Sequence, residues 1–329
     1  MPTTAGKRNL ITDVAGVHVG QAQDARVNTG VTVIVPESPA IAACMVAGGG
    51  PGTRETDLLA GGTLVDQVDA IFLSGGSAFG LGTGDGVMAR LKEAGRGFAV
   101  TRSPGVPPTP IVPGAILFDL ANGGDKDWGE VSPYAALGRK AFAGASEDFA
   151  LGRAGAGFGA SAGKFQGGTG SASIVTHDGM TVGAIACVNC VGSVLMPGTD
   201  TYWAWPFEQD GEFGGARPPA DFRMDAEDWG AAKSNPALGQ NTTIACIATD
   251  VALTPDQAKR VAQMAMSGFS RAIRPVFAPF DGDAVFVLST SRVALPDPAP
   301  LNVARIGELA ASTLARAIAR GVHEARGHA

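Results

Sequence analysis

Residues 242–249, Thr-Thr-Ile-Ala-Cys-Ile-Ala-Thr, decide the fold, because they join β-branched and small apolar residues in a run without a charge. Such a run predicts a buried strand. A helix is predicted soon after it, because Thr254 can cap a helix, Pro255 suits its first position and Gln257 completes a capping box. Residues 197–240, before the strand, hold three of the four tryptophans and eight acidic residues. A loop of this length is usually functional or disordered.

Other short apolar runs, stopped by glycine or proline, predict further strands with several helices between them. Ser171–Thr176 and Thr181–Val188 flank a His-Asp-Gly turn and predict a hairpin. The remaining predicted elements are strands at 31–35, 40–46, 69–74, 115–120 and 283–289 and helices ending near 91, over 133–144 and over 303–322. Adjacent hairpins in this mixture favour a layered α+β fold over a regular βαβ repeat.

The composition excludes several classes of protein. The chain has 329 residues, 47 of them glycine, and a net charge of −6. Without a Gly-X-Y period the glycine excess does not indicate collagen, and without a basic run nucleic acid is not expected as the main partner. No stretch is apolar enough to span a membrane, and residues 1–13 hold no apolar signal core. Four scattered cysteines do not form a disulfide framework, so we expect a reduced, cytoplasmic protein.

Three local patterns have the spacing of known sites but lack the residues that would complete them. Gly159-Ala-Ser-Ala-Gly163 matches a nucleophile elbow, yet the later histidines lie in a hairpin turn and a basic tail. Cys187 and Cys190 have redox or zinc spacing, but no second pair of ligands accompanies them. Residues 80–86 are rich in glycine but do not complete a dinucleotide-binding loop. We therefore expect neither a metal nor a cofactor.

The junction between Asn241 and Thr242 suggests a different chemistry. A hydroxyl nucleophile needs a proton acceptor, and the chain has only four histidines. An N-terminal threonine carries its own base, because its α-amine titrates near 7.7–8.0. Cleavage before Thr242 would create such a residue at the head of the predicted strand. A strand that simply begins with Asn-Thr-Thr is the alternative interpretation, and the pattern alone leaves both open.

The chain resembles the P1 family of autoprocessing aminopeptidases, formerly grouped as S58. This family includes L-aminopeptidase/D-amidase/esterases, β-peptidyl aminopeptidases and nylon-oligomer (6-aminohexanoate) hydrolases. The resemblance extends over nearly the whole chain and is carried in order by Ile11–Val17, Gly48–Asp57, Leu73–Gly80, Gly152–Gly157, Ala162–Lys164, Val188–Asn189, Asn241–Ile244 and Asp281–Asp283.

The resemblance implies an α+β fold, a four-layer αββα sandwich similar to the N-terminal nucleophile hydrolases but with a distinct topology. It also implies a single domain, residues 1–329, that cleaves itself between Asn241 and Thr242 into a large subunit (1–241) and a small subunit (242–329). The resemblance further implies that the protein needs no cofactor and forms a homo-oligomer, a tetramer. Thr242 would be the nucleophile of both self-cleavage and catalysis.

Four more residues match site positions of the family. Asn189 matches its active-site asparagine and is the candidate oxyanion donor, a suitable task for a side-chain amide dipole. Lys164 matches a lysine that could keep the Thr242 amine neutral. Asp281 and Asp283 match an acidic pair; on a strand both would face the nucleophile and could orient Thr242 and Lys164.

Three residues are expected to bind the substrate, and two of them lie in a glycine-rich turn. Phe118 stands where the nylon-oligomer branch has a site tyrosine, which leaves substrate choice open. Gly75 and Ser77 lie in one of the glycine-rich turns that we expect to shape an acyl-binding cleft around Thr242, because glycine lets the backbone approach a ligand closely.

The predicted function is a self-processing threonine hydrolase that cleaves amide or ester bonds at the amino end of short peptides or amino-acid amides. Three alternatives stay open: an endohydrolase of 6-aminohexanoate oligomers, an acyltransferase of the ornithine-acetyltransferase type, and an uncleaved binding protein without activity. The expected partners are small-molecule or short-peptide substrates and further copies of the chain, with no nucleic acid and no membrane.

Overall fold

Two β-sheets organise the chain in the computed structural model, which describes residues 3–101, 103–234 and 241–327. The larger sheet has six strands in the order β10 (Gly168–Val175), β11 (Thr181–Asn189), β12 (Thr242–Val251), β13 (Ala284–Val293), β3 (Ala40–Val46) and β5 (Gln67–Val68). The predicted strand after the long loop, β12, therefore lies at the centre of this sheet. It pairs antiparallel with β11 and parallel with β13.

The smaller sheet has five strands in the order β1 (Val17–Asp24), β2 (Thr29–Pro36), β6 (Ile71–Ser74), β7 (Gly114–Ile116) and β4 (Thr53–Arg54). A separate short hairpin joins β8 (Ser161–Ala162) to β9 (Phe165–Gln166). Five short 3₁₀ helices occur at η1 (Ile11–Asp13), η2 (Asp57–Leu59), η3 (Ser77–Gly82), η4 (Gly155–Gly157) and η5 (Trp205–Phe207).

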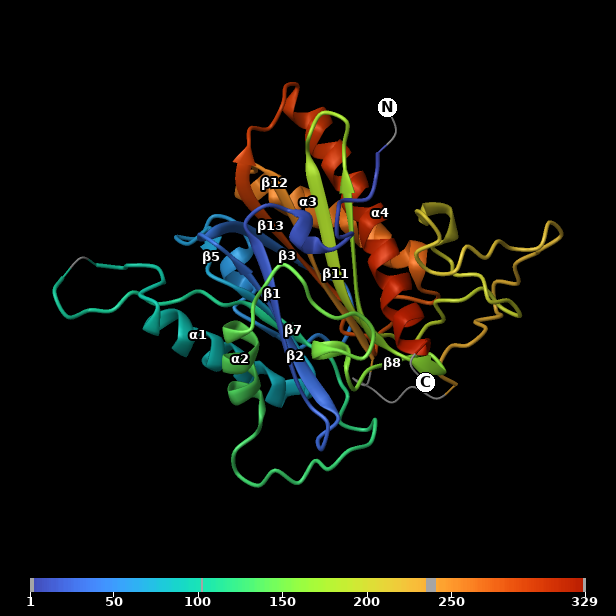
Figure 1. Cartoon of the computed structure of the whole chain (residues 1–329), viewed down its shortest axis with the longest axis horizontal. Coiled ribbons are helices and arrows are strands. Elements are labelled where there is room, and N and C mark those ends of the chain that lie inside the picture. Colours follow the sequence, from blue (N-terminus) through green and yellow to red (C-terminus); the bar gives the residue numbers. More distant parts are fainter. Residues whose placement is uncertain (1–2, 102, 235–240, 328–329) are drawn as a thin grey trace.

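Four α-helices pack against the sheets: α1 (Thr83–Glu93), α2 (Tyr134–Ala143), α3 (Pro255–Ala272) and α4 (Ala299–Arg326). Figure 1 shows α1 and α2 on one side of the molecule and α3 and α4 on the other. The capping box predicted for α3 is present, with Thr254 accepting from the Gln257 N–H. Helix α4 begins before its predicted start, because Pro300 occupies its first turn, where no backbone donor is needed.

Three apolar clusters form the core. One lies between the six-stranded sheet and helices α3 and α4, with Phe269 and Leu314 at its centre. A second contains residues of both sheets, among them Leu73 and Ile244. The third, around Phe72, packs the five-stranded sheet against α1 and α2. The protein thus has a mixed α+β fold, as predicted.

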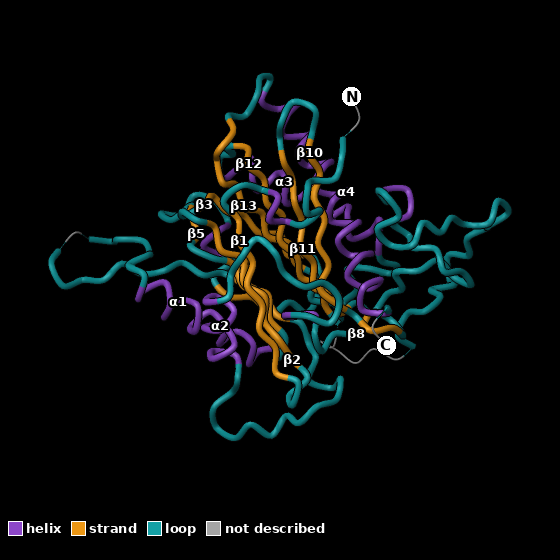
Figure 2. Tube along the Cα trace, in the orientation of Figure 1, coloured by secondary structure: helices purple, strands orange, loops and turns teal. Residues whose placement is uncertain are grey.

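Several predicted boundaries differ from the structure. The strand predicted over 115–120 ends at Ile116, because the backbone then turns to serve the loop at 75–77, where Ser77 donates to the Leu117 carbonyl. The strand predicted from 69 begins at Ile71. Residues 197–234 are mostly loop and lie outside α4 in the view of Figure 2. No helix within the described ranges is long and apolar enough to cross a membrane.

Candidate active site

Thr242 begins β12, and Asn189, the last residue of β11, lies directly opposite it. Side chains of opposite residues in an antiparallel pair project from the same face of a sheet. Both residues are almost completely buried. The sheet register therefore brings together the predicted nucleophile and the predicted oxyanion donor, which are far apart in sequence.

The peptide bond before Thr242 is intact, and two donors contact its carbonyl oxygen. The Thr242 hydroxyl Oγ1 donates to the Asn241 carbonyl, and the Gly282 N–H donates to the same oxygen at 2.9 Å. The hydroxyl thus lies against the carbonyl group that it would attack. The backbone donor lies where negative charge would develop on the oxygen.

Gly282 leaves the space that this arrangement needs. A Cβ atom at this position would lie 2.7 Å from Thr242 Oγ1 and 2.9 Å from the Gly50 carbonyl oxygen. Both separations are well below van der Waals contact of about 3.5 Å. Sequence reasoning missed Gly282, although its place between the two predicted aspartates was a usable signal.

Asp283 and Asp281 occupy the loop before β13, so the prediction that both lie on the strand is wrong. β13 begins at Ala284, after the loop has turned to bring Gly282 to the scissile bond. Asp283 accepts the Thr243 N–H at 2.6 Å and the Phe277 N–H at 3.2 Å. Asp281 accepts the Ala278 N–H at 3.1 Å. Among the described residues neither carboxylate hydrogen-bonds to Thr242 Oγ1, and the two act on the backbone around it.

The two carboxylates have perturbed acidity. Burial raises the pKa of Asp283 to about 7, and the negative charge of Asp281 adds to the effect. Burial also raises the pKa of Asp281. The two acids interact, so they titrate as a pair rather than independently.

Asn189 is held by backbone groups on both sides of its amide. Its Nδ2 donates to the Phe118 carbonyl at 3.0 Å, and its Oδ1 accepts the Ser161 N–H at 2.9 Å. Phe118 therefore contributes its backbone to the site, while its side chain is half-buried. Ser161, the serine of the apparent nucleophile elbow, begins the short strand β8 and serves the asparagine instead.

The lysine near the scissile bond is not the predicted one. Lys164 is exposed at the turn between β8 and β9, and within the described ranges its ammonium has no hydrogen bond or ion pair. Among the described residues of the intact chain its ammonium therefore has no hydrogen bond to Thr242, and its role beside a free Thr242 amine stays a prediction. Lys233 instead donates from Nζ to Asn241 Oδ1 at 2.9 Å. Sequence reasoning missed Lys233, because nothing in its local pattern distinguishes it from a solvated loop lysine.

Gly75 and Ser77 belong to a tight loop next to the Phe118 segment. The Gly76 N–H donates to Asp119 Oδ1 at 2.8 Å, and the Ser77 N–H donates to the Leu117 carbonyl. A Cβ at Gly75 would lie only 2.1 Å from the other Asp119 oxygen. The loop thus folds around a buried carboxylate, and its residues contact the site through the 117–119 backbone.

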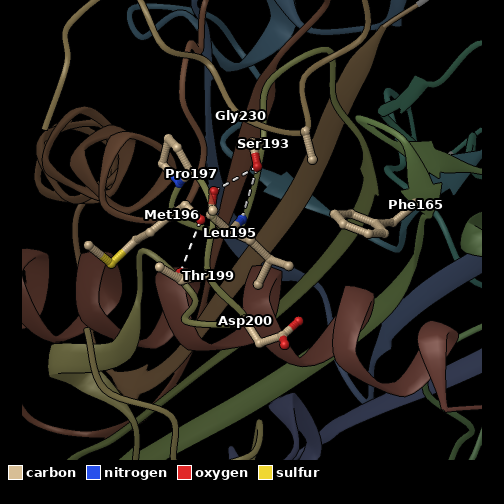
Figure 3. Close-up of a pocket in the computed structure, with 10 residues that line it drawn as sticks. Phe165, Ser193, Leu195, Met196, Pro197, Thr199, Asp200 and Gly230 are labelled. Carbon is tan, nitrogen blue, oxygen red and sulfur yellow. Dashed lines mark hydrogen bonds between the residues drawn. The ribbon is translucent and has the colours of Figure 1, made fainter. Parts of the chain in front are cut away.

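A pocket of about 340 Å³ adjoins the turn that carries Lys164. Phe165, Leu195 and Asp200 are among its lining residues, and Figure 3 shows the Phe165 ring and the Asp200 carboxylate at separate sides of it. Thr242 does not line it. Ala231 also lines the pocket; its carbonyl accepts the Lys164 N–H, and it lies two residues before Lys233 in the chain.

The cysteines Cys44, Cys187, Cys190 and Cys246 are buried and free. No group of three possible metal ligands occurs among the described residues. The site consists of a hydroxyl, amides, two carboxylates and one lysine, a set suited to acyl transfer.

Comparison with known proteins gives a consistent result. Residues 9–329 match the family model of peptidase family S58. An uncharacterized aminopeptidase of Mycobacterium tuberculosis (strain ATCC 25618 / H37Rv) is 43% identical, with 97% of this chain and 94% of the relative covered. The 6-aminohexanoate-oligomer endohydrolase of Kocuria sp. (strain KY2) is 32% identical, with 89% and 78% covered.

Two solved structures share the fold. A Burkholderia sp. beta-aminopeptidase superposes with a TM-score of 0.70 at 24% identity, covering 98% of this chain and 88% of that one. The L-aminopeptidase D-Ala-esterase/amidase of Ochrobactrum anthropi, described as a variant of the Ntn hydrolase fold, superposes with a TM-score of 0.68 at 21% identity, covering 98% and 87%.

Proposed function

Because the chain belongs to peptidase family S58 and is a hydrolase of peptide or amide bonds, we propose that it activates itself by cleavage between Asn241 and Thr242. The mature enzyme then releases the amino-terminal residue of short peptides or amino-acid amides through an acyl-enzyme on Thr242. The observation that carries the proposal is the Thr242 hydroxyl lying against the Asn241 carbonyl, whose oxygen also accepts the Gly282 N–H.

Self-cleavage proceeds in two steps. Thr242 Oγ1 forms a bond to the Asn241 carbonyl carbon, the C–N bond to Thr242 breaks, and the hydroxyl proton passes to the released nitrogen. One water molecule then hydrolyses the ester, which gives the Asn241 carboxylate and restores the Thr242 hydroxyl. The Gly282 N–H stabilises the oxyanion in both steps.

Turnover repeats this chemistry on a substrate. The new α-amine of Thr242, with an ordinary pKa of about 7.7–8.0, takes the hydroxyl proton and delivers it to the leaving amine. Asn189 and Gly282 are the oxyanion donors. Asp281 and Asp283 hold the backbone around Thr242, and Lys164 acts in the cleaved form, after the chain before Thr242 has been released. Phe118, Gly75 and Ser77 border the acyl group.

The proposal includes the finer points of architecture. The two sheets and the helix pairs outside them would form a four-layer αββα sandwich, which the three apolar clusters support. We further propose a cytoplasmic homo-oligomer, a tetramer, without a cofactor.

Endohydrolysis of 6-aminohexanoate oligomers is the second candidate, supported by the relative at 32% identity. Comparison of p-nitroanilides of L-, D- and β-amino acids with 6-aminohexanoate oligomers decides between the two. Release of product only when an acceptor amine is added would favour an acyltransferase instead.

A time course on a denaturing gel tests self-cleavage. We expect fragments of roughly 24 and 9 kDa from the 33.2 kDa chain, in proportion to residues 1–241 and 242–329. Thr242→Ala should stay intact and inactive, whereas the matched control Thr243→Val, one residue along the same strand, should cleave. Persistence of one 33.2 kDa band in the wild type would identify an uncleaved protein and end the proposal.

A further inference from the structure

The first cleavage cannot use the base that turnover uses. Before cleavage the Thr242 nitrogen is part of a peptide bond, and an amide nitrogen is not basic. The intact chain must therefore align the scissile carbonyl with groups that the mature enzyme does not need. Among the described residues upstream of the proposed cut, Lys233 hydrogen-bonds to the Asn241 side chain.

Lys233 holds the side chain of the scissile residue. Its Nζ donates to Asn241 Oδ1 at 2.9 Å, and Asn241 is completely buried. The backbone at Lys233 is itself anchored, because its N–H donates to the Val191 carbonyl at 2.9 Å. Two residues earlier, the Ala231 carbonyl accepts the Lys164 N–H at 2.8 Å. The lysine thus ties Asn241 to the loop that follows β11.

The surroundings of the ammonium group are charged and poorly hydrated. Burial lowers the pKa of Lys233, while the nearby Asp281 and Cys190 oppose that shift. Asp281 precedes Gly282, the donor to the Asn241 carbonyl, and Cys190 follows Asn189. Lys233 therefore links the side chain of Asn241 with both segments that carry proposed oxyanion donors.

Turnover requires this contact to be lost. Asn241 is buried against Thr242, so a substrate acyl group can reach the Thr242 hydroxyl only after Asn241 has withdrawn. Lys233 lies on the same side of the cut as Asn241. Its hydrogen bond therefore belongs to the state in which the chain is its own substrate.

We propose that Lys233 is a positioning residue for self-cleavage alone: it holds the Asn241 side chain so that the adjoining carbonyl stays between Thr242 Oγ1 and the Gly282 N–H. This inference rests on the proposed self-cleavage. It gives the segment before the proposed cut a role in self-cleavage and none in turnover.

The test separates the rate of cleavage from the rate of turnover. Lys233→Met should slow first-order cleavage of freshly translated chain about 10- to 100-fold, the effect of losing a hydrogen bond from a charged donor. Once mass spectrometry shows complete cleavage, its kcat and KM for an amino-acid p-nitroanilide should match the wild type within about twofold. Lys259→Met is the matched control, because Lys259 is also half-buried and donates from Nζ to a backbone carbonyl, that of Cys44.

Each outcome has one meaning. Cleavage of Lys233→Met at the wild-type rate, or a parallel loss of cleavage and turnover, overturns the role of Lys233. Absence of cleavage in the wild type overturns the proposed function instead. If Lys233→Met does not fold in the uncleavable Thr242→Ala background, Lys233→Gln, which keeps a donor, is measured in its place. Cleavage of Lys233→Gln at the wild-type rate would then overturn the role proposed for the Lys233 Nζ donor, and slowed cleavage with unchanged turnover would support it.

Discussion

Substitution of Gly282 by alanine tests the geometry of the scissile bond most directly. The added methyl group would lie 2.7 Å from Thr242 Oγ1 and 2.9 Å from the Gly50 carbonyl oxygen. Relief of the two contacts needs movements of roughly 0.8 and 0.6 Å, because carbon and oxygen atoms prefer a separation of about 3.5 Å. The movement turns the hydroxyl away or displaces the Gly282 N–H.

The consequence for the rate follows from the hydrogen bond. The Gly282 N–H lies 2.9 Å from the Asn241 carbonyl oxygen, and a separation of about 3.6 Å is no longer a hydrogen bond. Loss of one preorganised oxyanion donor typically costs about 10²- to 10³-fold in rate, or ~2.7–4 kcal/mol. We expect Gly282→Ala to cleave itself slower by this factor.

The assay is a pulse of synthesis followed by separation of precursor and fragments over time. Gly82→Ala is the matched control, because a Cβ at Gly82 meets no atom within 4 Å. Neither glycine has the positive φ that alanine would resist. The melting temperature of Gly282→Ala in the Thr242→Ala background shows whether the fold persists. Cleavage of Gly282→Ala at the wild-type rate would refute the role of the Gly282 N–H as an oxyanion donor. It would also refute the argument that a methyl group at this position crowds Thr242 Oγ1.

Three further predictions concern the pKa of Asp283, the buried ion pair between Arg316 and Glu212, and the role of Asn189 in catalysis. Burial raises the pKa of Asp283 to about 7 from its ordinary 3.8, so the folded protein binds more protons than the unfolded chain between about pH 4 and 7. The unfolding free energy of uncleavable Thr242→Ala, measured by urea titration, should therefore fall as pH rises through this window. Adding Asp283→Asn should flatten this dependence of unfolding free energy on pH. An unchanged dependence would contradict the prediction. Glu212→Gln leaves the fully buried Arg316 without its carboxylate, which should lower that free energy by about 3–5 kcal/mol; an unaltered melting temperature would argue against it. Asn189→Ala should reduce kcat/KM of cleaved enzyme about 10²- to 10³-fold, and unimpaired kinetics would exclude its amide as a donor.

The parts of the fold with strong local signals were predictable from sequence. The apolar run at 242–249 and the capping box at Thr254 each specify an element without help from the rest of the chain, and both are present. Pairing partners are set by contacts between distant segments. Neither the parallel pairing of β12 with β13 nor the antiparallel pairing of β13 with β3 has a signal in a single run of residues.

In the candidate site, too, some residues were predictable from sequence and others were not. Asn189 and Thr242 lie at the ends of two strands that were predicted separately, and the pairing of these strands, which was not predicted, places the two residues opposite each other. Asp281 and Asp283 were expected on a strand, but the chain turns there so that Gly282 can reach the Asn241 carbonyl. Lys233 escaped prediction, because only the tertiary fold brings its ammonium group to Asn241.

The order of strands in the six-stranded sheet has a consequence for the order in which folding and the proposed cleavage occur. β12 and β13 follow the proposed cut, yet β11 borders them on one side and β3 on the other, and both of these precede it. A separate small subunit would have to insert two strands into a sheet that is open in the middle. If the proposed cut occurs, we expect the continuous chain to fold first and to be cut afterwards. Two pieces produced by such a cut would meet only by diffusion after denaturation, so we expect the unfolding rate, rather than a folding equilibrium, to set the lifetime of a cleaved enzyme.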